Sequence, residues 1–292
     1  MTDARIRNVQ CSSPAGLHRI AYKEWGDPAN PRVLVCVHGV TRVADDFDAL
    51  ASALSDHYRV VCPDVAGRGR SDRLRNPDLY TVPQYVSDMV TLIARATANS
   101  DDGSVHWFGT SMGGLIGMVL ASLEDSPITK LVLNDIGPVL DRSAVQRIGD
   151  YIGQDLRFAD FDAGAAFVRE VSTSFGEHSD DEWTKLARDV LRQESDGSWV
   201  RHYDLNLAVP FRASTSERAD QDQAALWAAY DKIRCPTLLV RGALSDLLSH
   251  ETALTMTARG PKPQLVEIPN VGHAPTFIHD DQIAIARRFL IG

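Results

Sequence analysis

Short apolar segments rich in β-branched residues alternate with helix-like segments along much of this 292-residue chain. Nearly continuous apolar runs of this length are typical of strands that are buried on both faces of a parallel sheet. The strand-like segments are residues 32–39, 58–64, 105–109, 130–137 and 237–242, and the helix-like segments between them are 45–55, 82–98 and 112–123. Strand–helix–strand units at this spacing predict a right-handed, mostly parallel α/β sheet flanked by helices.

The two ends of the chain extend this pattern, and its middle interrupts it. Residues 6–11 and 17–26 predict an antiparallel hairpin at one sheet edge, and 264–269 and 280–291 predict a last strand and a last helix. Between about 140 and 230 the sequence is helical, and this stretch is too long for an unstructured loop. We therefore predict a core domain of residues 1–139 and 231–292, with a helical cap, residues 140–230, inserted after the sixth strand of the main sheet.

The predicted cap contains seven scattered large aromatic residues. We expect most of them to pack in the core of the cap itself, and we hypothesise that the cap aromatics also make the pocket apolar. They are Phe158, Phe161, Phe167, Trp183, Trp199, Phe211 and Trp227.

Charge and cysteine content narrow the class of protein. The net charge of −9 would repel a nucleic-acid backbone, so we expect no nucleic-acid partner. The four cysteines form no CxxC pair, so we expect no metal site from them, and no sequence motif indicates a cofactor. The longest apolar run, 33–37, is far shorter than the ~20 residues that span a bilayer. Residues 1–16 lack an apolar signal-peptide segment, which favours a cytoplasmic protein without membrane insertion.

The strongest chemical signal is the segment from Gly109 to Gly114, which reads GTSMGG. It follows a predicted strand and begins a predicted helix, the context that a nucleophile elbow requires. Gly109 and Gly113 leave room for the sharp turn, and Ser111 would stand at the helix N-terminus, where negative charge is stabilised. The alternative interpretation is an N-cap serine followed by glycines that serve packing.

A serine hydroxyl needs a base, and the base needs an orienting acid. His273 lies between Gly272 and Pro275 in the loop after the last predicted strand, and we predict it as the base. We predict Asp246, just past the strand at 237–242, as the acid. Asp135, past the sixth strand, is the alternative acid. If it is not the acid, we expect it to be a hydrogen-bonded loop residue.

An oxyanion formed on Ser111 would need hydrogen-bond donors already in place. The backbone N–H of Met112, which follows the nucleophile, is one predicted donor. The backbone N–H of Val40 is the other, because Val40 follows His38 and Gly39 in the loop after the strand at 32–39.

Five motifs together carry a resemblance to a known family. They are His38-Gly39, Asp64 to Asp72 (DVAGRGRSD), GTSMGG at 109–114, RGALSD at 241–246 and GHAP at 272–275. In this order they resemble the α/β-hydrolase fold superfamily, specifically its serine esterase, lactonase and non-haem haloperoxidase-like group. The resemblance implies that residues 64–72 form a structural turn near the pocket. Family members that are haloalkane dehalogenases or epoxide hydrolases carry an aspartate at the elbow, where this chain has Ser111.

We therefore predict an ester or lactone hydrolase that acts on a small, largely apolar substrate through an acyl-enzyme on Ser111. Short hydroxyalkanoate oligomers are one expected substrate, and perhydrolysis would be a side activity of the same serine. One alternative is a C–C bond hydrolase of vinylogous diketones, although Ala274 stands where those enzymes carry Trp after the histidine. The other alternative is a small-ligand receptor of the same fold. The sequence leaves the oligomeric state open, and a homo-oligomer is compatible with it.

Overall fold

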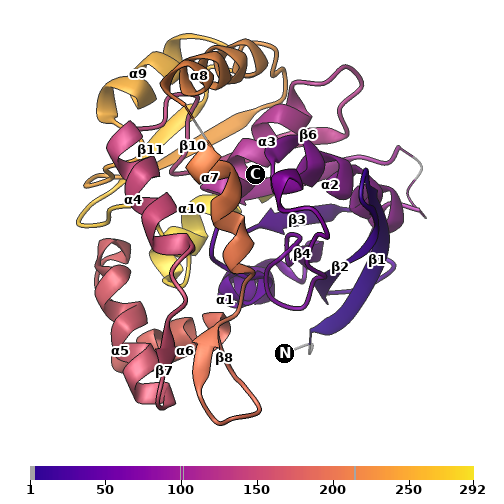
Figure 1. Ribbon diagram of the computed structural model, residues 1–292. Coiled ribbons are helices and arrows are strands. Elements are labelled where there is room, and N and C mark those ends of the chain that lie inside the picture. Colours follow the sequence, from indigo (N-terminus) through magenta and orange to yellow (C-terminus); the bar gives the residue numbers. More distant parts are fainter. Residues whose placement is uncertain (1–3, 99, 101, 214) are drawn as a thin grey trace.

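A twisted eight-stranded sheet runs through the computed structural model, which describes residues 4–98, 100, 102–213 and 215–292 (Figure 1). Residues 1–3, the start of the segment interpreted above as lacking a signal peptide, lie outside it. The strand order is β1-β2-β4-β3-β5-β6-β10-β11. The bounds are Arg5–Ser13 (β1), Gly16–Trp25 (β2), Val33–Val37 (β3), Arg59–Pro63 (β4), Val105–Thr110 (β5), Ile128–Asn134 (β6), Thr237–Gly242 (β10) and Gln264–Ile268 (β11).

The predicted mostly parallel sheet, with an antiparallel hairpin at one edge, is confirmed. β1 pairs with β2, and β2 with β4, in the antiparallel sense. All the remaining neighbours in the sheet pair in parallel. The carboxyl ends of the parallel strands therefore meet at one edge of the sheet, where sites form in open α/β folds.

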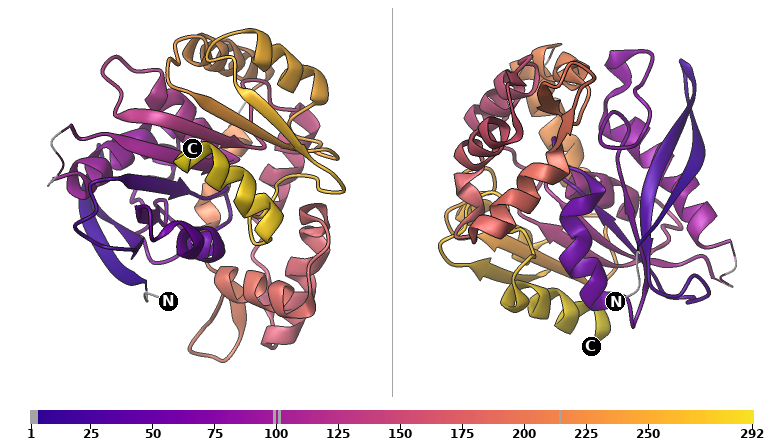
Figure 2. Two further views of the ribbon diagram at one scale, coloured as in Figure 1. Left: turned by 180° about the vertical axis from the view of Figure 1, so that it is seen from behind. Right: turned by 90° about the horizontal axis from the view of Figure 1, so that it is seen from below.

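Helices cover both faces of the sheet because successive side chains of a strand point to opposite sides. In β3, Val35 packs into the cluster that contains α2 and α3, whereas its neighbour Cys36 packs into the cluster that contains α1 and α10. Figure 2 shows the helix layers from behind and from below. The helices are α1 (Asp48–Leu54), α2 (Val82–Ala96), α3 (Met112–Ala121), α9 (His250–Ala258) and α10 (Asp280–Ile291). Burial of one such aliphatic side chain stabilises the fold by about 1.5–3 kcal/mol.

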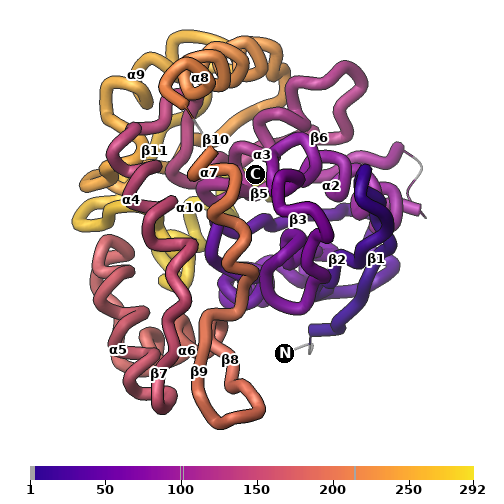
Figure 3. Tube along the Cα trace, in the orientation of Figure 1, coloured from indigo at the N-terminus to yellow at the C-terminus, as the bar shows by residue number. Residues whose placement is uncertain are grey.

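The segment between β6 and β10 forms a separate layer of short elements, which the trace in Figure 3 follows away from the sheet and back. Its elements are α4 (Arg142–Ile152), β7 (Arg157–Phe158), α5 (Phe161–Val171), α6 (Asp180–Val190), β8 (Leu191–Gln193), β9 (Trp199–Arg201), α7 (Ala208–Ala213) and α8 (Ser216–Tyr230). The antiparallel sheet β7-β9-β8 was not predicted. Strands of two or three residues are too short to show a sequence period. α8 packs against α3 of the main layer.

Four of the seven aromatic residues named above pack in two pairs, whereas Phe211 and Trp227 pack against the cluster that contains α2 and α3. The ring centroids of Phe158 and Phe167 lie 5.2 Å apart, as do those of Phe161 and Trp199.

Among the described residues, none of the seven aromatics named above lines the main pocket, so the hypothesis that the cap aromatics make it apolar is wrong for those seven. Three other aromatics of the segment between β6 and β10, Tyr151, Phe175 and Tyr203, do line it, together with aliphatic side chains of α4, α5 and α6.

Within the described ranges, no helix is both long enough and apolar enough to span a bilayer.

Candidate active site

Ser111 lies at the sharp turn between β5 and α3, as the GTSMGG segment predicts. Its backbone has φ 51° and ψ −116°, a conformation that non-glycine residues rarely adopt and that clusters at functional sites. The turn is fixed by a hydrogen bond from Ser111 N to Asn134 O of β6, 2.9 Å long. A Cβ atom at Gly113 would collide with the carbonyl of Val37, and one at Gly109 with the carbonyl of Gly113. Only glycine fits at either position.

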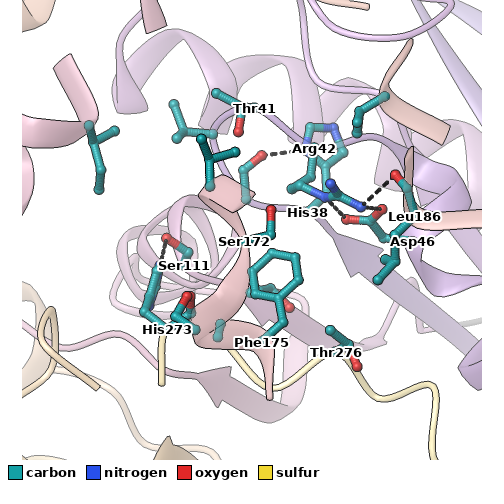
Figure 4. Close-up of a pocket in the computed structure, with 18 of the residues that line it drawn as sticks. His38, Thr41, Arg42, Asp46, Ser111, Ser172, Phe175, Leu186, His273 and Thr276 are labelled. Atoms are coloured by element: carbon teal, nitrogen blue, oxygen red, sulfur yellow. Dashed lines mark hydrogen bonds and ion pairs between the residues drawn. The ribbon is translucent and has the colours of Figure 1, made fainter. Parts of the chain in front are cut away.

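His273 connects Ser111 to a buried carboxylate. Its Nε2 lies 2.9 Å from Ser111 Oγ, and its Nδ1 lies 2.6 Å from Asp135 Oδ2. The first of these contacts is drawn in Figure 4. A carboxylate only accepts hydrogen bonds, so the ring proton sits on Nδ1. Nε2 is then free to accept the hydroxyl proton of Ser111, which is the geometry of a general base beside a nucleophile.

Asp135 is held from three sides. It directly follows β6, has φ 55° and is fully buried. Besides His273, the backbone N–H of Gly242 donates to its Oδ1 at 2.8 Å and the hydroxyl of Ser245 donates to its Oδ2 at 2.6 Å. Hydrogen bonds to the charged form stabilise a carboxylate in a buried position. This carboxylate is therefore both fixed in orientation and kept as an acceptor.

The prediction that Asp246 orients His273 is wrong. The Asp246 side chain is 52% exposed and pairs with Arg147 of α4 at 2.5 Å. It stands four residues after the end of β10, and the chain turns there through a hydrogen bond from Ser245 N to Gly242 O. That turn directs Ser245 toward Asp135 and places Asp246 at the surface.

The position of Asp135 along the chain gives a partial signal, although the apolar segment 130–137 conceals where β6 ends. Asp135 is the first residue after β6, just as Ser111 is the first residue after β5, and the two strands are neighbours. Residues that directly follow adjacent parallel strands are the ones that the sheet itself brings together.

The predicted oxyanion donor Val40 belongs to a peptide unit that His38 holds. His38 Nδ1 lies 2.7 Å from Gly39 O, and Val65 N donates to His38 Nε2 at 3.0 Å. His38 is therefore neutral with its proton on Nδ1, and burial lowers its pKa to about 4. Because N–H and C=O point in opposite directions across a trans peptide, fixing Gly39 O also fixes the N–H of Val40.

Val40 and Met112, the two predicted donors, are joined through one buried guanidinium. Arg68, only 1% exposed, donates from Nε to Val40 O at 2.9 Å and from Nη2 to Met112 Sδ at 3.3 Å. Nη1 donates to Ala66 O and to Tyr85 Oη. In the described part of the chain, neither backbone N–H of the two donors has a protein hydrogen-bond partner. The family resemblance implies only a structural turn for residues 64–72, and no period or spacing in the sequence marks Arg68.

A cavity of about 490 Å³ opens at Ser111. One side comes from the sheet-edge loops, which carry His38, Val40, Ser111 and His273, and the other side comes from the segment between β6 and β10. In Figure 4, Ser172 and Phe175 of that segment lie beside Ser111 and His273. The aliphatic wall consists of Val168, Val171, Leu186 and Val190. The serine thus stands in a mostly apolar cavity with a few polar groups, as small-molecule sites usually do.

The inserted segment also contacts the loop that carries His273. Ser174 Oγ donates to His273 O at 2.6 Å, and Gly272 N donates to Ser174 O at 2.6 Å. These two bonds tie the turn Thr173–Phe175 to the backbone on both sides of the histidine ring. No sequence pattern indicates this contact, because the two segments lie about a hundred residues apart.

One group of residues away from this pocket combines metal-binding residue types. Cys11 and His18 face each other across the β1–β2 hairpin, and with Asp88 of α2 their ligand atoms lie within 4.8 Å of one another. His18 Nε2 is 3.0 Å from Asp88 Oδ1, while burial raises the pKa of the Cys11 thiol to about 12. A protonated thiol beside a hydrogen-bonded His–Asp pair is a packed polar cluster. Spacing along the chain could not reveal it.

Several known proteins similar to this chain are named as hydrolases. The family model described as alpha/beta hydrolase fold matches residues 32–280. A 3-hydroxybutyrate-oligomer hydrolase of Cupriavidus necator is 58% identical over 291 residues, covering 99% of this chain and 98% of that protein. A bifunctional esterase/perhydrolase of Acinetobacter calcoaceticus is 25% identical, covering 92% and 96%. The solved structure of an α/β hydrolase from Novosphingobium aromaticivorans superposes with a TM-score of 0.85 at 34% identity, covering 100% of this chain and 99% of that one.

Proposed function

The chain belongs to the α/β hydrolase fold family as an ester-hydrolysing enzyme, and we propose that it works as a serine hydrolase with Ser111, His273 and Asp135 as its catalytic residues. The observation that carries this proposal is the continuous chain of hydrogen bonds from Ser111 Oγ through the His273 ring to Asp135. Asp135 replaces Asp246 in the role of the acid.

The proposed reaction follows from this arrangement. Ser111 Oγ attacks the ester carbonyl carbon while its proton passes to His273 Nε2. The negative charge on the carbonyl oxygen is stabilised by the N–H groups of Val40 and Met112. The alcohol leaves with the proton from His273. A water molecule then attacks the acyl-enzyme while its proton passes to His273, and His273 transfers that proton to Ser111 Oγ as the acid is released.

The substrate we propose is a short linear oligomer of a 3-hydroxy acid. The similarity to the Cupriavidus necator enzyme extends over both whole chains, which supports this class over unrelated esters. The aliphatic cavity wall supports it as well, since short alkyl groups are stabilised there by about 0.8 kcal/mol per buried methylene. We further propose that residues 140–230 act as a cap over Ser111, with α8 attaching that cap to the helix layer of the sheet.

Two measurements on the purified protein test the proposal. A fluorophosphonate should label the protein once, and mass spectrometry of the digest should locate the label on Ser111. The linear dimer of 3-hydroxybutyrate and p-nitrophenyl butyrate should be hydrolysed, and a vinylogous diketone should be turned over at least ~100-fold more slowly, because the site is arranged for acyl transfer. Preferential turnover of the diketone, or labelling elsewhere, would contradict it. β-Butyrolactone belongs in the same panel, to compare a cyclic with a linear ester.

A further inference from the structure

The pocket carries more positive than negative side chains, although the whole chain has a net charge of −9. Three arginines, Arg42, Arg147 and Arg201, line it together with two aspartates, Asp46 and Asp246. Fields inside a low-dielectric cleft concentrate ligands of the opposite charge. The cavity is therefore suited to a substrate with an anionic group.

Two of the three arginines are neutralised by a carboxylate. Arg42 forms a bidentate pair with Asp46, with both N···O distances 2.7 Å. Arg147 pairs with Asp246 at 2.5 Å, at a position where both side chains are more than half exposed. Neither guanidinium is free to bind a second carboxylate without giving up the first.

Arg201 differs from both. It ends β9, is 5% exposed, and has no carboxylate partner within the described ranges. Its Nη1 donates to Tyr151 O at 3.0 Å and its Nη2 donates to Gln154 O, whereas its Nε finds no partner among the described residues. A guanidinium has five N–H donors, so three of them have no protein partner among the described residues.

Aromatic rings hold this guanidinium in place. Its central carbon lies 4.8 Å from the ring centroid of Tyr151 and 5.0 Å from that of Tyr203, and both tyrosines also line the pocket. Arg201 is thus fixed before any ligand arrives, which lowers the entropic cost of binding. A rigid, buried and unpaired guanidinium in a pocket wall is suited to bind a carboxylate.

We propose that Arg201 binds the free carboxylate of a linear hydroxy-acid ester whose ester carbonyl lies at Ser111. This inference rests on the function proposed above and assigns one end of the substrate within the same cavity. In a linear hydroxy-acid oligomer the free carboxylate always lies on the alcohol side of each ester bond. Arg201 therefore binds the leaving group, and the hydroxyl end of the oligomer forms the acyl-enzyme.

The bonds that change are those of ordinary ester hydrolysis. The Ser111 Oγ–acyl bond forms, the bond from the acyl carbon to the alcohol oxygen breaks, and His273 transfers the serine proton to that oxygen. The first product is a free hydroxy acid, whose carboxylate is paired with Arg201 when the ester bond breaks and then dissociates. Water then releases the second hydroxy acid from Ser111. Neutral esters and lactones lack the group that Arg201 recognises.

The wild-type protein provides the first test, with two substrates that differ only in that group. The kcat/KM for the linear dimer of 3-hydroxybutyrate should exceed that for its methyl ester by ~10-fold or more, since a charge-assisted pair is lost in the ester. Equal values for the two substrates would overturn the inference. This comparison holds even if substitutions at Arg201 impair folding.

Two substitutions then locate the effect. Arg201→Met should reduce the acid-to-ester ratio to near one, and Arg201→Lys should keep part of it, because the charge remains without the planar fork. Arg192→Gln is the matched control, because Arg192 of the neighbouring strand β8 pairs with Glu194 and does not line the pocket, and it should keep the ratio within ~3-fold. Retention of the acid-to-ester ratio in Arg201→Met, or an equal loss in Arg192→Gln, would overturn the assignment.

The same substrates separate this inference from the proposed function. If the wild type hydrolyses neither p-nitrophenyl butyrate nor the dimer methyl ester, the ester-hydrolase proposal fails, and the carboxylate site fails with it. If both are hydrolysed but the free acid has no advantage, only the assignment of Arg201 is overturned.

Discussion

The sheet edge and the inserted segment contribute to the same cavity in different ways. Ser111 and Asp135 each follow a parallel strand directly, and neighbouring backbone groups fix both. The segment between β6 and β10 instead contributes the aliphatic wall and Arg201, from short helices and a small sheet of its own. Under the proposed function, the reacting atoms depend on the register of the main sheet, whereas substrate preference depends on packing within the segment between β6 and β10. The predictions below test that division.

Substitution of Ser111, the proposed nucleophile, should have the largest effect. Ser111→Ala should lower kcat for p-nitrophenyl butyrate by ~10⁵-fold or more, while the thermal unfolding temperature stays nearly the same, because only one hydroxyl is removed. Steady-state kinetics and circular dichroism check the two parts. Residual activity within tenfold of wild type would show that the sheet edge does not hold the nucleophile.

Substitutions of the two candidate acids, Asp135 after β6 and Asp246 after β10, should differ clearly in their effect on kcat. Asp135→Asn should lower kcat by ~10³–10⁴-fold, because an amide can favour the wrong tautomer of His273. Asp246→Asn should cost tenfold or less, since its carboxylate pairs only with Arg147 at the surface. Kinetics of both purified variants decide the matter, and the reverse order would restore Asp246 as the acid.

Arg68 should affect the chemical step without contacting substrate. Arg68→Lys cannot keep contacts to both Val40 and Met112, so we expect kcat to fall by ~10-fold or more with little change in KM, as for loss of oxyanion stabilisation. Arg70→Lys, two residues away in the same turn, is the control and should stay within ~3-fold of wild type. A change in KM alone would indicate a different role for Arg68.

Ser174 tests whether the segment between β6 and β10 also affects the chemical step, because it belongs to that segment but contacts the His273 loop. Ser174→Ala removes the hydroxyl that donates to His273 O, so kcat should fall by roughly 3- to 10-fold with KM nearly constant. Thr173→Ala, the neighbouring substitution, should change kcat less. An unchanged kcat in Ser174→Ala would mean that the insertion does not help to place the histidine.

Asp189 of α6 should show the smallest effect, on stability alone. Burial raises its pKa to about 6, against the pull of Lys185 at 2.7 Å. The folded state then binds its proton more tightly than the unfolded state, so this group costs stability as pH rises from about 4 to about 6, and the cost persists above that. Asp189→Asn should reduce the loss of Tm between pH 5 and pH 7 by a few degrees, without a change in kcat. Thermal unfolding at both pH values measures it, and identical pH slopes in wild type and variant would contradict it.

Patterns within single segments predicted most of the fold. The apolar runs located the central strands, and the GTSMGG segment located Ser111 at a strand–helix turn. The last strand and last helix define the loop of His273, whose Nε2 lies 2.9 Å from Ser111 Oγ in the structure. These features depend on local spacing, which a sequence displays directly.

Features that depend on which segments meet in space were harder to predict. The choice between Asp135 and Asp246 depends on how the chain turns after β10, and that turn depends on Ser245 reaching Asp135. The contacts of Arg201 with Tyr151 and of Arg68 with Val40 join residues that are tens of positions apart. Polar contacts of this kind leave no period in the sequence.

The two bonds of Ser174 bear on how this enzyme could be re-engineered. β6 and β10 are adjacent in the sheet, so the chain between them could be exchanged for that of another hydrolase without disturbing the strand order. Such a chimera would acquire a new binding wall while keeping the original Ser111 and Asp135. It would lose the donor and acceptor that Ser174 offers to the backbone at Gly272 and His273. A graft should therefore retain the tripeptide Thr173–Phe175, or its turnover will fall for reasons unrelated to the new substrate.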